Sequence, residues 1–227
     1  IYFKPDGLAI YAQSGTEVVY QYTLGTAWDL SSASFSKSIS LVGSNAEGFV
    51  FSPNGDRFYI LDSGLDELHQ YDLSTPWEID TATATPSGIL DAAAVVSTVS
   101  RLAISQDGTK LYIVQYNNEE VTEVSLLTPF DVTTAQLGGD EIAVFRFDEL
   151  RNATIGGMFL KPDGQKFYIS DYNNDQILEF DATPGQIKTP YQLSFFPNII
   201  WEGGVAPSQS PTGDKDWFRF ETANGGA

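Results

Sequence analysis

The stretch that decides the fold is Phe159–Phe180, which reads FLKPDGQKFYISDYNNDQILEF. Its Pro-Asp-Gly segment is typical of a tight turn, because Pro presets φ and Gly accepts the positive φ that such turns need. A second reversal is predicted at Asn173–Asp175, where Asn and Asp tolerate left-handed conformations. Between and beyond the turns, successive residues point to alternate sides with the period of two that strands have. The stretch therefore predicts three strands joined by two hairpin turns.

The same sequence motif recurs three times earlier in the chain. The turn glycines Gly7, Gly55, Gly108 and Gly164 lie 48, 53 and 56 residues apart. This spacing is close to the roughly 40–50 residues of a four-stranded propeller blade. Each copy is rich in Tyr, Phe, Val and Ile, which favours strands over helical repeats. The sequence thus predicts an all-β protein, a β-propeller of four-stranded antiparallel blades with about four blades in this chain, and a short C-terminal β segment.

The repeats occupy residues 1–197, in copies of approximately 1–44, 45–97, 98–150 and 151–197. Residues 198–227 form a linker and strand cassette that contains an alternating strand at 216–222. Four copies predict either a ring closed with the help of this cassette or part of a larger ring. Because the chain opens in mid-motif, it is expected to be a fragment or a processed product.

Two pairs of segments carry the repeat most clearly: Phe3–Gly7 with Gln21–Ala33, and Phe51–Ile60 with Gln70–Ala82. These repeats resemble those of bacteriophage tail-fibre and virion structural proteins. The segment Ile200–Pro207, with Asp216–Ala227, looks like a terminal cassette of the same class. The resemblance covers most of the chain and implies a non-enzymatic virion protein of a tail fibre, appendage or surface decoration, acting in particle assembly or host attachment. It implies a virion or extracellular location and partners among other virion proteins and a host-surface receptor or glycan, in a symmetric homo-oligomeric assembly.

The amino-acid composition argues against nucleic-acid binding, membrane insertion and thiol chemistry. Lys and Arg number 12 against 30 Asp and Glu, so the formal charge is −18 and nucleic acid is an unfavourable partner. The sequence has no run of about 18 apolar residues, so membrane insertion is not expected. Cysteine is absent, which excludes disulfides and thiolate chemistry.

The residues offer little for catalysis. His69 is the only histidine, so a Ser-His-Asp arrangement would need it, and a lone strand histidine is more often a surface or interface residue. We therefore predict that the protein is not an enzyme and has no catalytic residues. Two other classes stay open: a secreted bacterial cell-surface propeller that binds carbohydrate or calcium, and a propeller hydrolase or lactonase with a cation held by carboxylates on the axis.

One loop has the chemistry of a cation site. Asp171, Asn173 and Asp175 offer oxygen ligands at alternate positions, as calcium loops do. Gln176 stands where such loops have Gly, and no Glu follows at the twelfth position, so a plain hairpin turn is the alternative. No other cofactor is predicted.

An aromatic residue recurs after the third strand of three repeats, as Trp28, Trp77 and Phe130, and Pro184 takes its place in the fourth. These rings could stack on a sugar. Their recurrence at one place in each repeat favours instead a role as anchors of the loop between the third and fourth strands.

Overall fold

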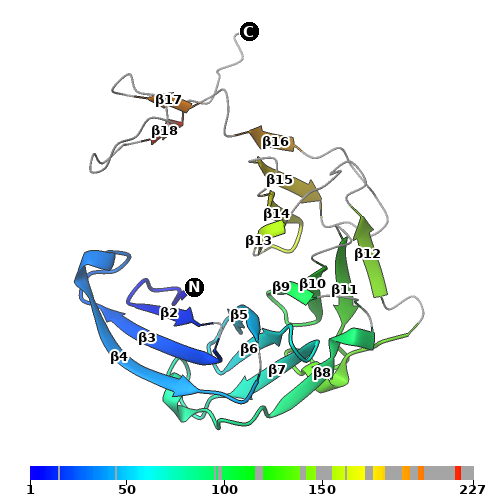
Figure 1. Ribbon diagram of the computed structural model, residues 1–227, viewed down its shortest axis with the longest axis horizontal. Helices are drawn as coiled ribbons and strands as arrows, with labels where there is room; N and C mark the ends of the chain where they lie inside the picture. Colours follow the sequence, from blue (N-terminus) through cyan, green and yellow to red (C-terminus); the bar gives the residue numbers. More distant parts are fainter. Residues whose placement is uncertain are drawn as a thin grey trace.

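The computed structural model places four antiparallel sheets one after another along an arc (Figure 1). It describes residues 1–14, 16–43, 45–94, 96, 99–115, 120–138, 142–146, 155–161, 163–171, 176–181, 191–194, 199–201 and 218–220. We number the sheets as blades in chain order. Each blade falls inside one of the four repeats, which confirms the all-β propeller fold and its four-stranded blades.

The strands of each blade follow one another in sequence as a meander. Blade 1 contains β1 (Tyr2–Phe3), β2 (Ala9–Gln13), β3 (Val18–Leu24) and β4 (Ala33–Ser40). Blade 2 contains β5 (Ala46–Phe51), β6 (Arg57–Asp62), β7 (Glu67–Asp72) and β8 (Gly88–Asp91). Blade 3 contains β9 (Val99–Ile104), β10 (Lys110–Gln115), β11 (Glu120–Ser125) and β12 (Ile142–Arg146). Blade 4 contains β13 (Ile155–Leu160), β14 (Lys166–Asp171), β15 (Gln176–Asp181) and β16 (Tyr191–Ser194).

Short 3-10 turns join some of these strands: η1 (Leu30–Ser32), η2 (Ile79–Thr81), η3 (Ala92–Ala94) and η4 (Val132–Thr134). In the C-terminal cassette, β17 (Ile199–Trp201) pairs antiparallel with β18 (Phe218–Phe220). Only β18 lies within the strand that the sequence predicts at 216–222. No helix in the described part of the chain is long and apolar enough to cross a membrane.

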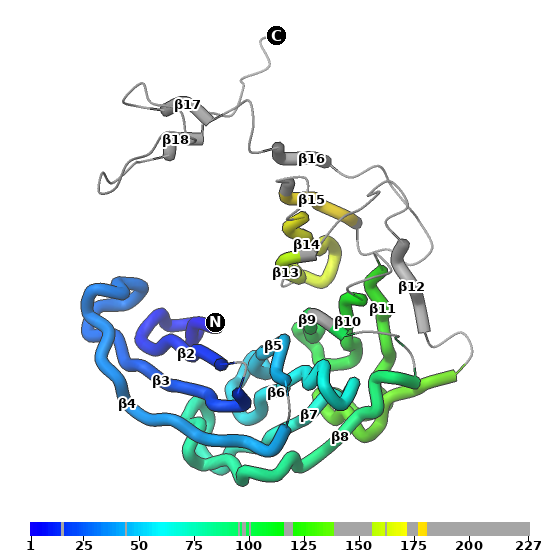
Figure 2. The backbone as a smooth tube through the Cα atoms, viewed as in Figure 1, coloured from blue at the N-terminus to red at the C-terminus, as the bar shows by residue number. Residues whose placement is uncertain are grey.

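In blade 2, the first strand, β5, lies on the inside of the arc and the last strand, β8, on the outside (Figure 2). Blades 1 and 4 form the two ends of this arc. The described strands therefore look like part of a ring, with one sheet face left over at each end.

In blades 1, 2 and 3, the turn after the first strand requires glycine for two reasons. Gly55 has φ +73, which an L side chain rarely adopts, as the sequence predicts. In addition, a Cβ at Gly55 would lie only 2.1 Å from the ring of Trp77, whose backbone N–H donates to the Gly55 carbonyl at 2.8 Å. Trp28 covers Gly7 and Phe130 covers Gly108 in the same manner. The prediction that these aromatic residues anchor the loop is confirmed.

In blades 2 and 3, alternating residues of the second strand pack against different blades. In β6, Phe58 and Ile60 belong to the apolar cluster shared with blade 1, whereas Tyr59 and Leu61 belong to the cluster shared with blade 3. All four side chains are at most 2% exposed. Because both sides of a central blade are apolar, one blade cannot bury its faces alone, and neighbouring blades provide the core.

Two polar contacts repeat at successive blade junctions. The Tyr11 hydroxyl donates to the Trp77 carbonyl at 2.8 Å, and the Tyr59 hydroxyl donates to the Phe130 carbonyl at 2.7 Å. Burial raises the pKa of both tyrosines well above the usual value, so both hydroxyls stay protonated donors.

The second contact joins a glutamine of the third strand to the 3-10 turn of the following blade. The Ile79 N–H donates to the Gln21 side-chain oxygen at 3.3 Å, and the Val132 N–H donates to that of Gln70 at 3.0 Å. Blades 1 and 2 thus each contact the aromatic loop of the following blade through a tyrosine and a glutamine.

Candidate functional site: the axial channel

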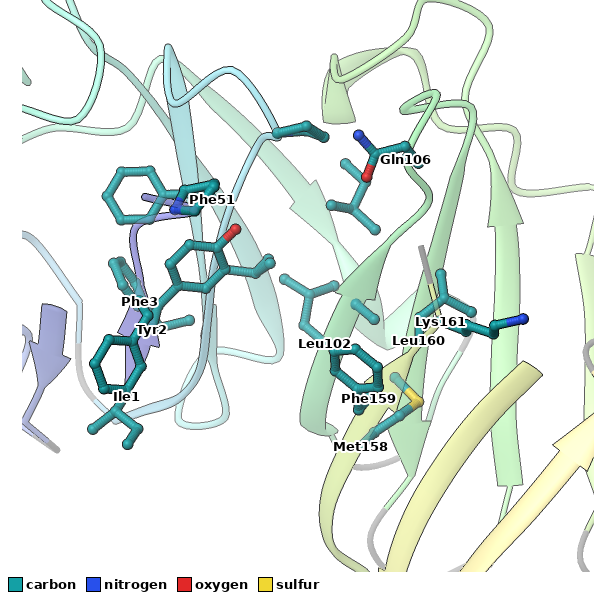
Figure 3. A pocket seen from close by; sticks show the side chains of 16 residues that line it. Ile1, Tyr2, Phe3, Phe51, Leu102, Gln106, Met158, Phe159, Leu160 and Lys161 are labelled. Carbon is teal, nitrogen blue, oxygen red and sulfur yellow. The ribbon is translucent and has the colours of Figure 1, made fainter. Parts of the chain in front are cut away.

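The innermost strands of all four blades surround one depression on the inside of the arc. Its volume is about 760 Å³, and most of its lining is apolar. Figure 3 shows Ile1, Tyr2 and Phe3 on one side and Met158 and Phe159 on the other. These residues come from the two ends of the arc, so the blades bring together side chains that are far apart in the sequence.

A second depression of about 490 Å³ continues this channel toward a polar end. The two share Ile1, Phe49, Leu102 and Met158 as lining residues. We call the two depressions together the axial channel. Its polar end is lined by Gln13, Glu47 and Arg101, among other residues.

Arg101 joins three blades at this polar end. From β9 its guanidinium donates to the Glu47 carboxylate of blade 2 at 3.2 Å and to the Gly156 carbonyl of blade 4 at 3.0 Å. The side chains of Arg101 and Glu47 remain about one third exposed. The channel therefore offers an apolar middle and an accessible ion pair at one end, a combination suited to binding an elongated apolar segment or ligand with a polar terminus.

The predicted calcium loop is only partly described. Asp171 is the last residue of β14 and is 2% exposed, whereas Asn173 and Asp175 lie outside the described residues. Its equivalent in blade 2, Asp62, accepts hydrogen bonds from the backbone N–H groups of Asn45, Gly64 and Leu65. An aspartate at this position thus has a structural use in the hairpin. The described residues contain no group of three or more Asp, Glu, His or Cys that could hold a metal.

His69 lies away from the axial channel. It is 3% exposed, and its Nε2 is 2.7 Å from a Glu67 carboxylate oxygen. The residues that line the channel do not include it. This placement agrees with the expectation that a lone histidine on a strand lies at an interface.

One buried carboxylate was not foreseen from the sequence. Glu17, in the turn before β3, is 4% exposed, and neither of its carboxylate oxygens makes a hydrogen bond of good geometry with a described residue. A Cβ at Gly43 would lie 2.6 Å from Glu17 Cγ and 2.9 Å from Asp62 Oδ2, so the two acids converge there. Burial and then the Asp62 carboxylate raise the pKa of Glu17, while the Ala46 amide and His69 lower it by less.

We expect Glu17→Gln to raise the free energy of unfolding at pH 7, because the amide removes the cost of burying an unpaired charge. The folded state holds the Glu17 proton more tightly than the unfolded state does. Stability of the unmodified protein should therefore rise as the pH falls from neutral through the raised pKa, and level off near the ordinary value of 4.5. Urea unfolding of both proteins at several pH values measures this.

Asp66→Asn is the matched control, because Asp66 occupies the equivalent turn position in blade 2, also at positive φ, and is only half-buried. It should leave the pH dependence between neutral pH and 4.5 unchanged. If Glu17→Gln and the unmodified protein showed the same dependence over this interval, the buried charge would not be the cause.

The fold and channel define this chain as a set of β-propeller blades, and solved structures agree. A provisionally named 6-phosphogluconolactonase from Bacteroides uniformis matches 85% of this chain and 55% of its own, with TM-score 0.54 and 12% identity. A second protein of that provisional name, from Bacteroides fragilis, matches with TM-score 0.55 and 11% identity over the same shares. The Cps50 (Swd1) β-propeller domain of Myceliophteria thermophila matches 85% of this chain and 58% of its own, with TM-score 0.54 and 12% identity.

These similarities show the fold alone, because all three identities are low. The chain spans little more than half the length of each of these structures. No family model matches the sequence, and no curated protein matches it significantly.

The prediction that the protein is not an enzyme is contradicted by these comparisons, since two of the matched propellers carry the name of an enzyme. The physical reason is that the absence of cysteine and the single histidine exclude only thiol and histidine chemistry. A propeller can bring carboxylates and cations from several blades to its axis, as Glu47 and Arg101 do here. The repeats therefore predict the fold without excluding catalysis.

Proposed function

We propose that this protein is a β-propeller component of a bacteriophage particle, in a tail fibre, appendage or surface decoration, and that it acts in assembly or host attachment. The resemblance of the repeats and of the C-terminal cassette to those of phage virion proteins supports a place for this chain in a phage particle. The observation that carries the binding role is the axial channel, with its apolar middle and the Arg101–Glu47 pair at one end.

The expected partner is a segment of another virion protein or a host-surface receptor or glycan, bound outside the host cell. Blades hold the residues around the channel rigidly, so a ligand would find the surface already formed. The acidic charge of the chain favours a partner that is neutral or basic where it contacts the rim.

Mass spectrometry of purified particles tests the location. We expect this chain among the virion proteins in an amount comparable with other tail or surface components. Particles that contain their capsid and tail proteins but lack this chain would contradict the proposal.

Capture of virion subunits on the immobilised protein tests the binding surface. Lys161 lines the channel and pairs with Asp163, while Lys4 occupies the same turn position in blade 1 and pairs with Asp6. Lys161→Glu should weaken capture and Lys4→Glu should not. Equal effects of the two variants would place the binding surface elsewhere.

Lactone hydrolysis is a second candidate, favoured by the names of two matched structures and by the Glu47 carboxylate at the axis. In this case Glu47 would activate the attacking water and Arg101 would bind an anionic group of the lactone. Hydrolysis of 6-phosphogluconolactone above the spontaneous rate, abolished by Glu47→Gln, would support it. A rate equal to the spontaneous one would exclude this substrate.

A further inference from the structure

Two buried carboxylates meet at the junction between blades 1 and 2. Glu17 belongs to the turn before β3 of blade 1, and Asp62 is the last residue of β6 in blade 2. Their exposed fractions are 4% and 0%. Neither residue lines the axial channel. Two like charges at this burial are costly unless each has a partner, so a positive group at this junction would stabilise the folded chain.

Both carboxylates border the same small space beside Gly43, in the segment between β4 and β5. A Cβ on Gly43 would lie 2.9 Å from Glu17 Cδ and 2.9 Å from Asp62 Oδ2. Because Gly43 has no side chain, this space is left to the two acids. Gly43 itself is exposed, so the space can be reached from solvent. The two acids therefore face each other at one accessible point of the junction.

The two carboxylates differ in their partners. Asp62 Oδ1 accepts hydrogen bonds from the backbone N–H groups of Asn45, Gly64 and Leu65, so the hairpin of blade 2 holds this side chain in place. Asp62 Oδ2 is the oxygen beside Gly43. Neither Glu17 oxygen makes a hydrogen bond of good geometry with a described residue. Glu17 thus brings acceptor oxygens to this space that the described chain does not use.

Two donors near the pair have other partners. The Tyr71 hydroxyl donates to the Val42 carbonyl at 3.3 Å, and burial followed by the two acids raises the pKa of this hydroxyl. His69 Nε2 lies 2.7 Å from a Glu67 carboxylate oxygen. No Lys or Arg among the described residues forms an ion pair with Glu17. The described side chains therefore leave the Glu17 charge without a close positive partner.

The next junction has no such pair of acids. Asp66 and Gln115 occupy the positions in blades 2 and 3 that Glu17 and Asp62 occupy in blades 1 and 2. Gln115 is neutral, and its side-chain amide donates to the Glu120 carboxylate at 3.1 Å. Asp66 is only half-buried. The blade architecture therefore does not require two buried acids at this position.

We propose that Glu17 and Asp62 bind a divalent cation, calcium, between blades 1 and 2. Carboxylate oxygens are the ligands that calcium and magnesium prefer, and a doubly charged ion neutralises both acids at once. Only two acids converge here, so backbone carbonyls and water complete the coordination shell. Calcium accepts about 6–8 oxygens in an adaptable arrangement, whereas magnesium demands nearly octahedral geometry, so a site of mixed ligands favours calcium.

Bound calcium stabilises the folded chain because the two ligands come from different blades. Unfolding separates Glu17 from Asp62, so the cation binds the folded state far better than the unfolded one. The site also differs from the predicted loop at Asp171, since it combines the hairpin aspartate of one blade with an acid of the preceding blade. This inference stands apart from the proposed function, because it concerns a blade junction and not the axial channel.

Thermal unfolding at pH 7 of the chain freed of metal by a chelator tests the proposal. We expect about 10 mM calcium chloride to raise Tm by roughly 3–10 °C, the shift for a dissociation constant of about 0.1–1 mM. Potassium chloride of the same ionic strength only screens charge and should give a smaller shift. Equal shifts with the two salts would overturn the proposal. A magnesium shift as large as the calcium shift would overturn the choice of calcium.

Glu17→Gln should abolish the calcium-dependent rise in Tm, and calorimetric titration should show the loss of one calcium site per chain. In chelator alone this variant should be the more stable protein, because it lacks the buried charge, so calcium should reverse the order of the two. Asp66→Asn is the matched control and should keep the full rise. Circular dichroism checks that both variants are folded.

Three results would count against the cation. An unmodified chain whose Tm does not respond to calcium would overturn the proposal, and a rise at lower pH in its place would mean that the two acids share a proton. A rise of the same size in Glu17→Gln would place calcium elsewhere on this acidic chain. Loss of the rise in Asp66→Asn as well as in Glu17→Gln would show that total charge, and not this pair of acids, determines the response.

Discussion

Gly55→Ala is expected to lower the free energy of unfolding by about 2–4 kcal/mol. An L side chain in the left-handed region costs about 1–2 kcal/mol, and overpacking a filled site adds a cost of similar size. Gly55 has φ +73, and its new methyl group would meet the Trp77 ring at 2.1 Å. The ring would have to leave the turn, which would also expose the loop before η2. Urea unfolding followed by tryptophan fluorescence measures the loss.

Gly164→Ala separates the two contributions. Gly164 lies in the same turn of blade 4 with φ +70, and a Cβ there has no heavy atom of a described residue within 4 Å. Only the backbone cost applies, so we expect a loss of about 1–2 kcal/mol. Equal losses at the two glycines would mean that the aromatic cover contributes nothing, and would refute the reading of Trp77 as a loop anchor.

The blades were predictable because they depend on local patterns. Pro-Asp-Gly turns and the period of two act within a few residues, and their repeat at about 50 residues predicts the architecture. The turn at Gly55 follows from the sequence for this reason. The contact of Trp77 with Gly55 is harder to predict, because it joins the first hairpin of a blade to the loop after its third strand.

The tyrosine of the second strand is expected from the sequence to lie between blades with its hydroxyl paired, but its partner was not predicted, because the two residues are more than one repeat apart. The Tyr59 hydroxyl reaches a carbonyl 71 positions away, and the Ile79 N–H reaches Gln21 over 58 positions. Tyrosine, and glutamine or glutamate, recur at fixed places in each repeat, and this recurrence could have indicated that these side chains contact the neighbouring blade.

The axial channel and the Glu17 carboxylate depend on where whole blades lie. Arg101 meets Glu47 only because the blades turn about one axis, and neither residue belongs to a motif. Turn acids usually face water, so nothing in the sequence around Glu17 indicates burial. A prediction from single repeats therefore finds the turns and misses the site.

Ile79→Ala is expected to have the largest effect of any substitution discussed here. Ile79 is 0% exposed in the cluster between blades 1 and 2, and truncating such a side chain costs about 2–5 kcal/mol. Its N–H also receives the Gln21 contact, so a cavity at this position loosens the junction on which blade 1 depends. Urea unfolding should show the loss, and amide exchange should rise first in β3 and η2.

Leu30→Ala at the equivalent position of blade 1 is the matched comparison. Leu30 is 59% exposed, so in a single chain its truncation should cost less than about 0.5 kcal/mol. A loss at Leu30→Ala as large as that at Ile79→Ala would mean that burial at the blade junction is not the cause of the Ile79→Ala effect.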